Sequence, residues 1–162
     1  MKKLLSALLV LVMLLSLPGV GALAASDGLT WSLDKKGTLT ISGKGEMPDY
    51  SGDTPPWEKY RDDIKAVVIE KGVTHIGTQC FQFCTNLKSV TIPSSVESIG
   101  AAAFYRCEKL SAVYYGGTAS DWDEIEIARY NKRLTSAELV FSDAETPAPA
   151  SSGKPSAGSK LK

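Results

Sequence analysis

Four carboxylates are the residues best placed for chemistry, because they lie within one short segment: Asp121, Asp123, Glu124 and Glu126. A pair of such groups hydrolyses glycosidic bonds when one is held protonated and the other ionised. On a short helix, however, these acids alternate with the apolar Trp122 and Ile125, which is typical of a solvated face. We therefore interpret the cluster as surface charge, and glycan hydrolysis is the least favoured function.

The cysteines and the single histidine have the ligand types of a zinc site: His75, Cys80, Cys84 and Cys107. His75 lies between Val73 and Ile76, in a position that faces outward if those two residues face the core. Its ring then points away from the thiols, so we predict no metal site. Nucleophile-elbow, phosphate-loop and metal-helix motifs are also absent from the sequence. The sequence predicts a protein that is not an enzyme and needs no cofactor.

Two of the cysteines leave a choice open. Cys84 and Cys107 are 23 residues apart. If the chain repeats at that step, their backbones lie about 5 Å apart, within the range of a disulfide. Stacked side chains point in parallel, however, and a free cysteine packs well as a small apolar core residue. The pattern allows either a Cys84–Cys107 bridge or two buried thiols.

A repeat of 23 residues organises the middle of the chain. Segments 64–69, 87–92 and 110–115 have apolar residues at matching positions. The register also holds between segments for Val73 with Val96, Ile76 with Ile99, Gly77 with Gly100, Phe81 with Phe104, and Cys84 with Cys107. A fixed step of this length is the signature of a stacked solenoid, in which each unit covers the apolar face of its neighbour.

Each unit has a recognisable order of elements. Residues 90–92 alternate apolar and polar, which favours a strand with one buried face, and Pro93 ends the backbone pairing. Gly100 allows a sharp bend. Residues 101–107 indicate one or two helical turns. The fold class is therefore an α/β solenoid with parallel strands on one face and short helices on the other.

The repeat pattern resembles a known family. Leu-x-x-Val-x-Ile-Pro-x-x-Val-x-x-Ile-Gly-x-x-Ala-Phe-x-x-Cys, from Leu87 to Cys107, is similar to the BspA-like bacterial leucine-rich repeats. Unit 64–84 departs from it at Ile64, Glu70 and Cys80. Residues 28–34 with 37–43, and Pro56-Trp57, resemble the family's N-terminal segment. Trp122, residues 131–134 and residues 137–141 resemble its C-terminal closing unit. The resemblance covers roughly residues 27–142 and implies a secreted or surface-exposed protein in binding or adhesion.

The flanks complete the expected domain organisation. Residues 1–24 have the basic start, apolar core and small-residue site of a signal peptide, so we expect no transmembrane segment after cleavage. The pattern of residues 25–63 predicts a capping hairpin, a loop and a short helix. The repeats are 64–86, 87–109 and 110–142, the last including a closing unit. Residues 143–162, rich in Pro, Ser and Gly, indicate a disordered tail.

The balance of basic and acidic side chains limits the class of partner. The chain has 18 basic and 18 acidic side chains, and loss of Lys2 and Lys3 with the signal peptide leaves 16 against 18. Without a basic stripe, nucleic acid is not expected as a partner. We expect a secreted or surface-associated module that binds protein or glycan through its outward strand face, which contains Lys65, Val68, Lys88, Ser89, Thr91 and Tyr114. A purely structural assembly role is the alternative.

Overall fold

The computed structural model of the chain describes residues 20–26 and 28–141. Its longer strands are β1 (Val20–Ser26), β2 (Leu29–Leu33), β3 (Thr38–Gly43), β5 (Ala66–Ile69), β6 (Val73–Ile76), β7 (Ser89–Ile92), β9 (Ala112–Tyr115) and β11 (Glu138–Phe141). The two-residue strands are β4 (Gly45–Glu46), β8 (Ser98–Ile99) and β10 (Glu126–Ile127). The helices described are a 3-10 helix, η1 (Glu58–Tyr60), and the short α1 (Ala119–Asp123) and α2 (Lys132–Thr135).

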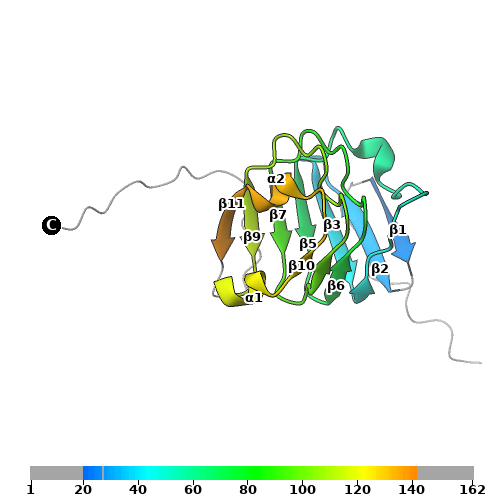
Figure 1. The fold of residues 1–162 in the computed structure, drawn as a ribbon. Coiled ribbons are helices and arrows are strands. Elements are labelled where there is room, and N and C mark those ends of the chain that lie inside the picture. The colour runs from blue at the N-terminus through cyan, green and yellow to red at the C-terminus, as the bar shows by residue number, and fades with distance from the viewer. Residues whose placement is uncertain (1–19, 27, 142–162) are drawn as a thin grey trace, which may run out of the picture.

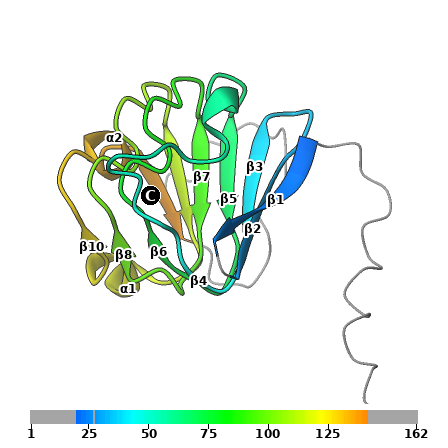
Figure 2. The same cartoon turned by 90° about the vertical axis from the view of Figure 1, so that its right-hand side faces the viewer.

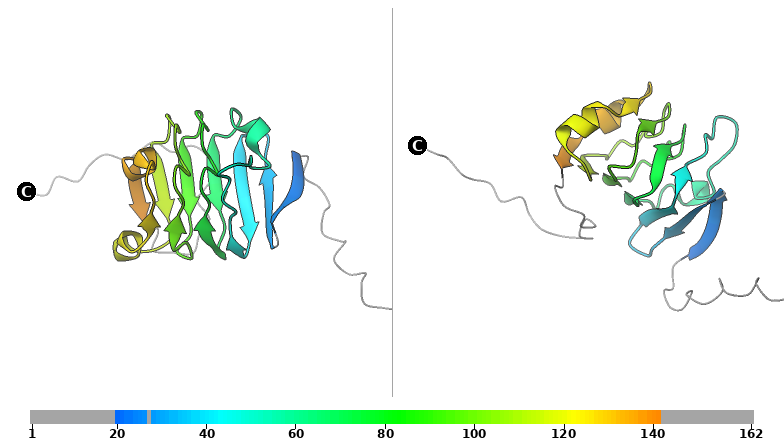
Figure 3. Two further views of the ribbon diagram at one scale, coloured as in Figure 1. Left: turned by 45° about the vertical axis from the view of Figure 1, so that its right-hand side comes forward. Right: turned by 90° about the horizontal axis from the view of Figure 1, so that it is seen from below.

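The larger sheet contains seven strands in the order β1-β2-β3-β5-β7-β9-β11 (Figure 1). From β3 onward all neighbours are parallel and in register. Val67, Val90 and Val113 therefore lie side by side, as the 23-residue step predicts. The left view of Figure 3 shows these strands following one another across the stack. The leucine-rich repeat arrangement with parallel strands is confirmed.

The stack begins earlier than the sequence indicates. β2 and β3 form the predicted antiparallel hairpin, with Trp31 opposite Ile41. β3 then pairs in parallel with β5, placing Leu39 beside Val67, so this strand is already a rung of the parallel sheet. That the hairpin acts as a cap stays a prediction. β1 pairs antiparallel with β2 and contains residues 20–24 of the expected signal peptide. Residues 1–19, 27 and 142–162, which include all of the expected tail, lie outside the described part.

The prediction that short helices cover the opposite face is wrong for the repeats. A second sheet of short parallel strands, in the order β10-β8-β6-β4, lies there instead (Figure 2). Residues 101–106 form turns rather than helix. Alternate backbone N–H groups of the preceding coil donate hydrogen bonds to the carbonyls of these turns, from Phe81 to Ala103 (2.9 Å) and from Phe83 to Tyr105 (2.8 Å). A helix would use these donors within itself.

The core runs through the stack between the two sheets. Val67, Val90 and Val113 are at most 1% exposed, and they belong to one continuous apolar cluster. Trp57, Phe81 and Phe104 stack in succession, with ring centroids 5.7 and 5.3 Å apart. The indole N–H of Trp57 donates to the buried carbonyl of Cys80 at 2.9 Å. Each coil therefore supplies part of its neighbour's apolar wall, which is what ties repeats into one unit.

Candidate binding surfaces

The outward face of the larger sheet brings the predicted strand residues together. One row crosses the parallel strands at their centres: Thr40, Val68, Thr91, Tyr114 and Val140. A second row contains Thr38, Ala66, Ser89, Ala112 and Glu138. Lys65 and Lys88 lie just before β5 and β7, and their backbones stack because Lys88 N–H donates to the Lys65 carbonyl at 2.8 Å. We call the two rows with these lysines the strand face.

The strand face changes character along the stack. Its early strands present small and hydroxyl side chains that are partly buried, whereas Tyr114 and Val140 are each 37% exposed. Tyr114 lies beside Val140 in register, so an aromatic ring and an apolar side chain adjoin at the β9–β11 end. A large exposed ring beside apolar surface is a typical anchor in protein interfaces.

The cysteines are free thiols in the structure, and all three are buried. The Cys84–Cys107 bridge left open by the sequence is not formed. The Cys107 thiol instead donates to the Phe81 carbonyl at 3.2 Å. Burial raises the pKa of Cys84 to about 12 and also raises the pKa values of Cys80 and Cys107. Thiols held neutral in this way are poor nucleophiles and poor metal ligands.

His75 takes part in a local contact on the smaller sheet. Its Nδ1 lies 2.7 Å from the hydroxyl of Ser98, and its Nε2 lies 3.7 Å from Asp49. The backbone N–H of Thr78 donates to Asp49, and the Thr78 hydrogen bonds are the main cause of a lowered Asp49 pKa. Within the described residues no group of three potential metal ligands comes together.

The four carboxylates are exposed, as expected for a solvated face. Asp121 is the third residue of α1 and forms a capping box with Thr118, the residue before the helix: its carboxylate accepts from the Thr118 N–H, and its own N–H donates to the Thr118 hydroxyl. These bonds to Thr118 lower the pKa of Asp121. The role of Asp121 in the structure is therefore helix capping, and none of the four acids lies in a buried site.

A second surface, not found from the sequence, lies along the turns. Phe83, Tyr105 and Tyr130 are 40%, 36% and 62% exposed. Each has an arginine guanidinium over its ring: Arg61 at 5.7 Å, Arg106 at 5.7 Å and Arg129 at 5.4 Å, respectively. The Phe83 and Tyr105 rings also meet edge to face at 5.9 Å. We call these six residues the turn ladder.

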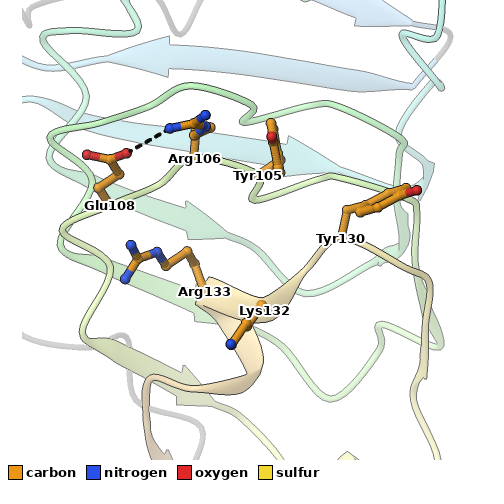
Figure 4. Close-up of a pocket in the computed structure, with 6 residues that line it drawn as sticks. All are labelled: Tyr105, Arg106, Glu108, Tyr130, Lys132 and Arg133. Atoms are coloured by element: carbon orange, nitrogen blue, oxygen red, sulfur yellow. Dashed lines mark hydrogen bonds and ion pairs between the residues drawn. The ribbon is translucent and has the colours of Figure 1, made fainter.

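The turn ladder borders a shallow hollow of about 260 Å³. Its lining consists of Tyr105, Arg106, Glu108, Tyr130, Lys132 and Arg133. Figure 4 shows Lys132 and Arg133 extending from α2 on one side, with Arg106 and Glu108 joined by an ion pair of 3.4 Å. Among the described residues, Lys132 and Arg133 have no ion-pair partner. The hollow therefore has three cations and one carboxylate.

Asn131 fixes the position of this hollow, and only 3% of it is exposed. Its side-chain oxygen accepts from the Phe104 N–H at 3.1 Å, and its amide nitrogen donates to the carbonyls of Gly100 and Ala128, each at 2.9 Å. It thus links the turn before α2 to the turn that bears Tyr105 and Arg106. Sequence reasoning assigned 131–134 to the closing unit, and the adjoining Tyr–Arg pairs were the signal it passed over.

Comparisons with known proteins agree with this architecture. The family described as "BspA type Leucine rich repeat region (6 copies)" matches residues 59–139. A leucine-rich repeat protein from Eubacterium ventriosum, known from a crystal structure, is 41% identical with a TM-score of 0.53. That match covers 56% of this chain but only 24% of the Eubacterium chain. No curated protein is significantly similar to the chain.

The family bears on function only in general terms. Leucine-rich repeats generally act as non-enzymatic scaffolds that bind proteins, and BspA-type members are typically secreted or surface proteins of bacteria. Among the described residues, no helix is long and apolar enough to span a bilayer. The register of the parallel strands, the 23-residue step and the matched half of the sequence lead to one conclusion. The chain belongs to the family of BspA-type leucine-rich repeat proteins.

Proposed function

We propose that the protein is an exported, surface-associated interaction module that binds a protein partner through the strand face. The observation that carries the proposal is the row in which Thr91, Tyr114 and Val140 adjoin across parallel strands. The early strands offer small hydroxyl side chains that accept close approach of another backbone. The Tyr114 ring supplies the apolar anchor near the β9–β11 end. Lys65 and Lys88 add polar contacts at one border.

The size of this surface predicts modest affinity. Five parallel strands at about 4.8 Å spacing give a width of roughly 20 Å, so each partner would bury roughly 600–800 Å². Such an area lies at the small end of specific interfaces, where a few anchors decide affinity. A protein partner is favoured over a glycan on this face because Tyr114 is the one aromatic residue in its two rows.

A paired variant tests the strand face. The mature parent, a Tyr114→Ala/Lys88→Ala variant and a Tyr130→Ala control would each be crosslinked to surface proteins from the source cells, with contacts mapped by mass spectrometry. We expect crosslinks to one partner to map to β7, β9 and β11 in the parent and control and to vanish in the double variant. Retention of that partner by the double variant would contradict the proposal.

Export of the protein has its own test. Sequencing the amino terminus of protein secreted from a bacterial host should give a start near Ala25, whereas retention of residues 1–24 would exclude signal cleavage.

Assembly is the second candidate function. It is favoured by the exposed Val140 and Phe141 on β11, the last strand of the larger sheet among the described residues. Light scattering that shows multimers lost on Val140→Ser would support this role.

A further inference from the structure

We propose that the hollow beside α2 is a second binding site and that its ligand is an acidic carbohydrate, an oligosaccharide whose rings bear carboxylates. The site is separate from the strand face. It is built from the turns at residues 105–108 and from residues 130–133 at the start of α2. The proposal therefore stands or fails independently of the protein partner proposed above.

Charge segregation points to an anionic ligand. Residues 105–109 and 129–133 contain five cations and one carboxylate, whereas residues 28–141 as a whole contain 13 cations and 15 carboxylates. Glu108 pairs with Arg106, whereas the other four cations have no ion-pair partner among the described residues, and two of these, Lys132 and Arg133, line the hollow. A guanidinium binds a carboxylate through two parallel hydrogen bonds, so Arg106 and Arg133 suit that ligand group.

The exposed aromatic rings point to a sugar. Tyr105 and Tyr130 are large rings that border the same hollow, and Tyr130 is 62% exposed. The C–H faces of a sugar ring are apolar, while its edges are polar hydroxyls. Such a ring packs flat on an aromatic side chain and still reaches nearby cations. Figure 4 shows Tyr130 beside the hollow, away from the Arg106–Glu108 pair, so that ring and charge contacts can be made at once.

The backbone gives an independent reason to assign function to these positions. Phe83, Arg106 and Tyr130 have φ of 63°, 62° and 67°, in the left-handed region that favours glycine. Gln79 and Ala102 share this conformation, so the turns themselves require it. At three such positions the sequence nevertheless places large exposed side chains. Local strain of this kind is concentrated at functional sites, which supports a binding role for the turn ladder.

The surroundings argue against a nucleic acid or an acidic peptide. A polyphosphate chain needs an extended basic track, yet residues 28–141 contain more acids than bases, and the eight cations outside residues 105–109 and 129–133 are interspersed with acidic residues along the sequence. An acidic peptide would use the cations but leave the exposed faces of Tyr105 and Tyr130 without a matching ring. A carboxylated sugar uses both features. The favoured ligand is therefore an oligouronate.

The test measures binding of four probes to the mature chain by isothermal titration calorimetry. The probes are a short oligogalacturonate, its methyl ester, oligoglutamate and oligothymidylate. The ester keeps the rings without the charge, and oligoglutamate keeps the charge without the rings. We expect oligogalacturonate to bind, with the other three at least about tenfold weaker. Equal or tighter binding of oligoglutamate or oligothymidylate would overturn the sugar assignment, as would failure of oligogalacturonate to bind.

Glycine variants separate binding from folding. Arg106→Gly and Tyr130→Gly remove the side chains and relieve the left-handed backbone, so we expect an unchanged or higher melting temperature and at least about tenfold weaker oligogalacturonate binding. Ala102→Gly is the matched control, because it relieves the same conformation outside the hollow lining and should bind as the parent does. The Tyr114→Ala/Lys88→Ala variant should also keep oligogalacturonate binding. Parent-like affinity in both hollow variants would refute the site.

Discussion

Asn131→Ala is the sharpest test of how the last coils are held together. The substitution removes one acceptor and two donor contacts: Phe104 N–H loses its partner, as do the carbonyls of Gly100 and Ala128. A typical buried hydrogen bond contributes about 1 kcal/mol, and a buried group left unsatisfied costs about 1–3 kcal/mol. Two of the three bonds are buried, so we expect a loss of about 2–4 kcal/mol in the free energy of unfolding.

The assay is urea unfolding followed by far-ultraviolet circular dichroism and tryptophan fluorescence. A small domain has a denaturant slope of about 1–3 kcal/mol per molar urea, so the midpoint should fall by about 1–2 M. Asn131→Asp provides a second reading. It keeps the acceptor for Phe104 but places a carboxylate beside two carbonyls. We expect it to be as destabilising as alanine at pH 7 and to recover part of the loss below pH ~4, where a protonated carboxyl donates again.

Asn86→Ala is the matched control for this prediction. Asn86 also makes two side-chain hydrogen bonds, donating to the Asp62 carbonyl at 2.8 Å and accepting from Lys109 at 2.7 Å, but both lie at the surface where water replaces them. Its loss should cost about 0.5 kcal/mol or less. If Asn131→Ala and Asn86→Ala lower the stability equally, the reasoning from burial is wrong.

Three further predictions follow from the core and its charges. All three thiols should resist a thiol reagent at pH 8 in the native protein and react on unfolding in urea, whereas a single reactive thiol per unfolded chain would reveal a disulfide. Trp57→Phe keeps the ring stack on Phe81 but removes the hydrogen bond to the Cys80 carbonyl and leaves a cavity. The free energy of unfolding should therefore fall by about 2–3 kcal/mol, and a loss below about 0.5 kcal/mol would contradict this. The Asp49 pKa is lowered from 3.8 in the folded state, so its carboxylate stabilises the fold above that pH, and the stabilisation is lost as pH falls through the lower folded value. Asp49→Asn should therefore be less stable than the parent at pH 6, with the difference shrinking below pH 3.8, and a difference that does not change with pH would argue against the linkage.

The parallel register was predictable because it depends on a strict period. Val67, Val90 and Val113 share one offset, and a shift of one residue would turn each of them outward. The turns were not predictable in the same way. Ala101–Ala103 has strong helix propensity, but Ala102 and Arg106 adopt left-handed φ of 55° and 62°, and their neighbours bond between coils. Tertiary hydrogen bonding overrides local propensity at this position.

The turn ladder escaped sequence analysis for a related reason. Columns built on the 23-residue step align Phe83 with Arg106, an aromatic residue with a cation, so no column looks like a surface of one kind. In the structure, however, the ring of Phe83 contacts the ring of Tyr105, which comes one residue before Arg106, the residue that the 23-residue step aligns with Phe83. A pattern search that pairs ring and guanidinium at adjacent positions would detect it. Aligning residues at the 23-residue step reveals a surface only where the same type of side chain recurs at each step.

The two surfaces respond differently to the length of the stack. Each added coil extends the strand face by one rung, because its outward rows run through every parallel strand from β3 to β11. The hollow, in contrast, needs Asn131 and α2, which occur once, at the end of the described stack. The chain matches only 24% of the length of the Eubacterium protein, so a longer relative would enlarge the strand face without multiplying the hollow. Affinity for a protein partner should then grow with repeat number, whereas oligouronate binding should stay at one site per closing unit.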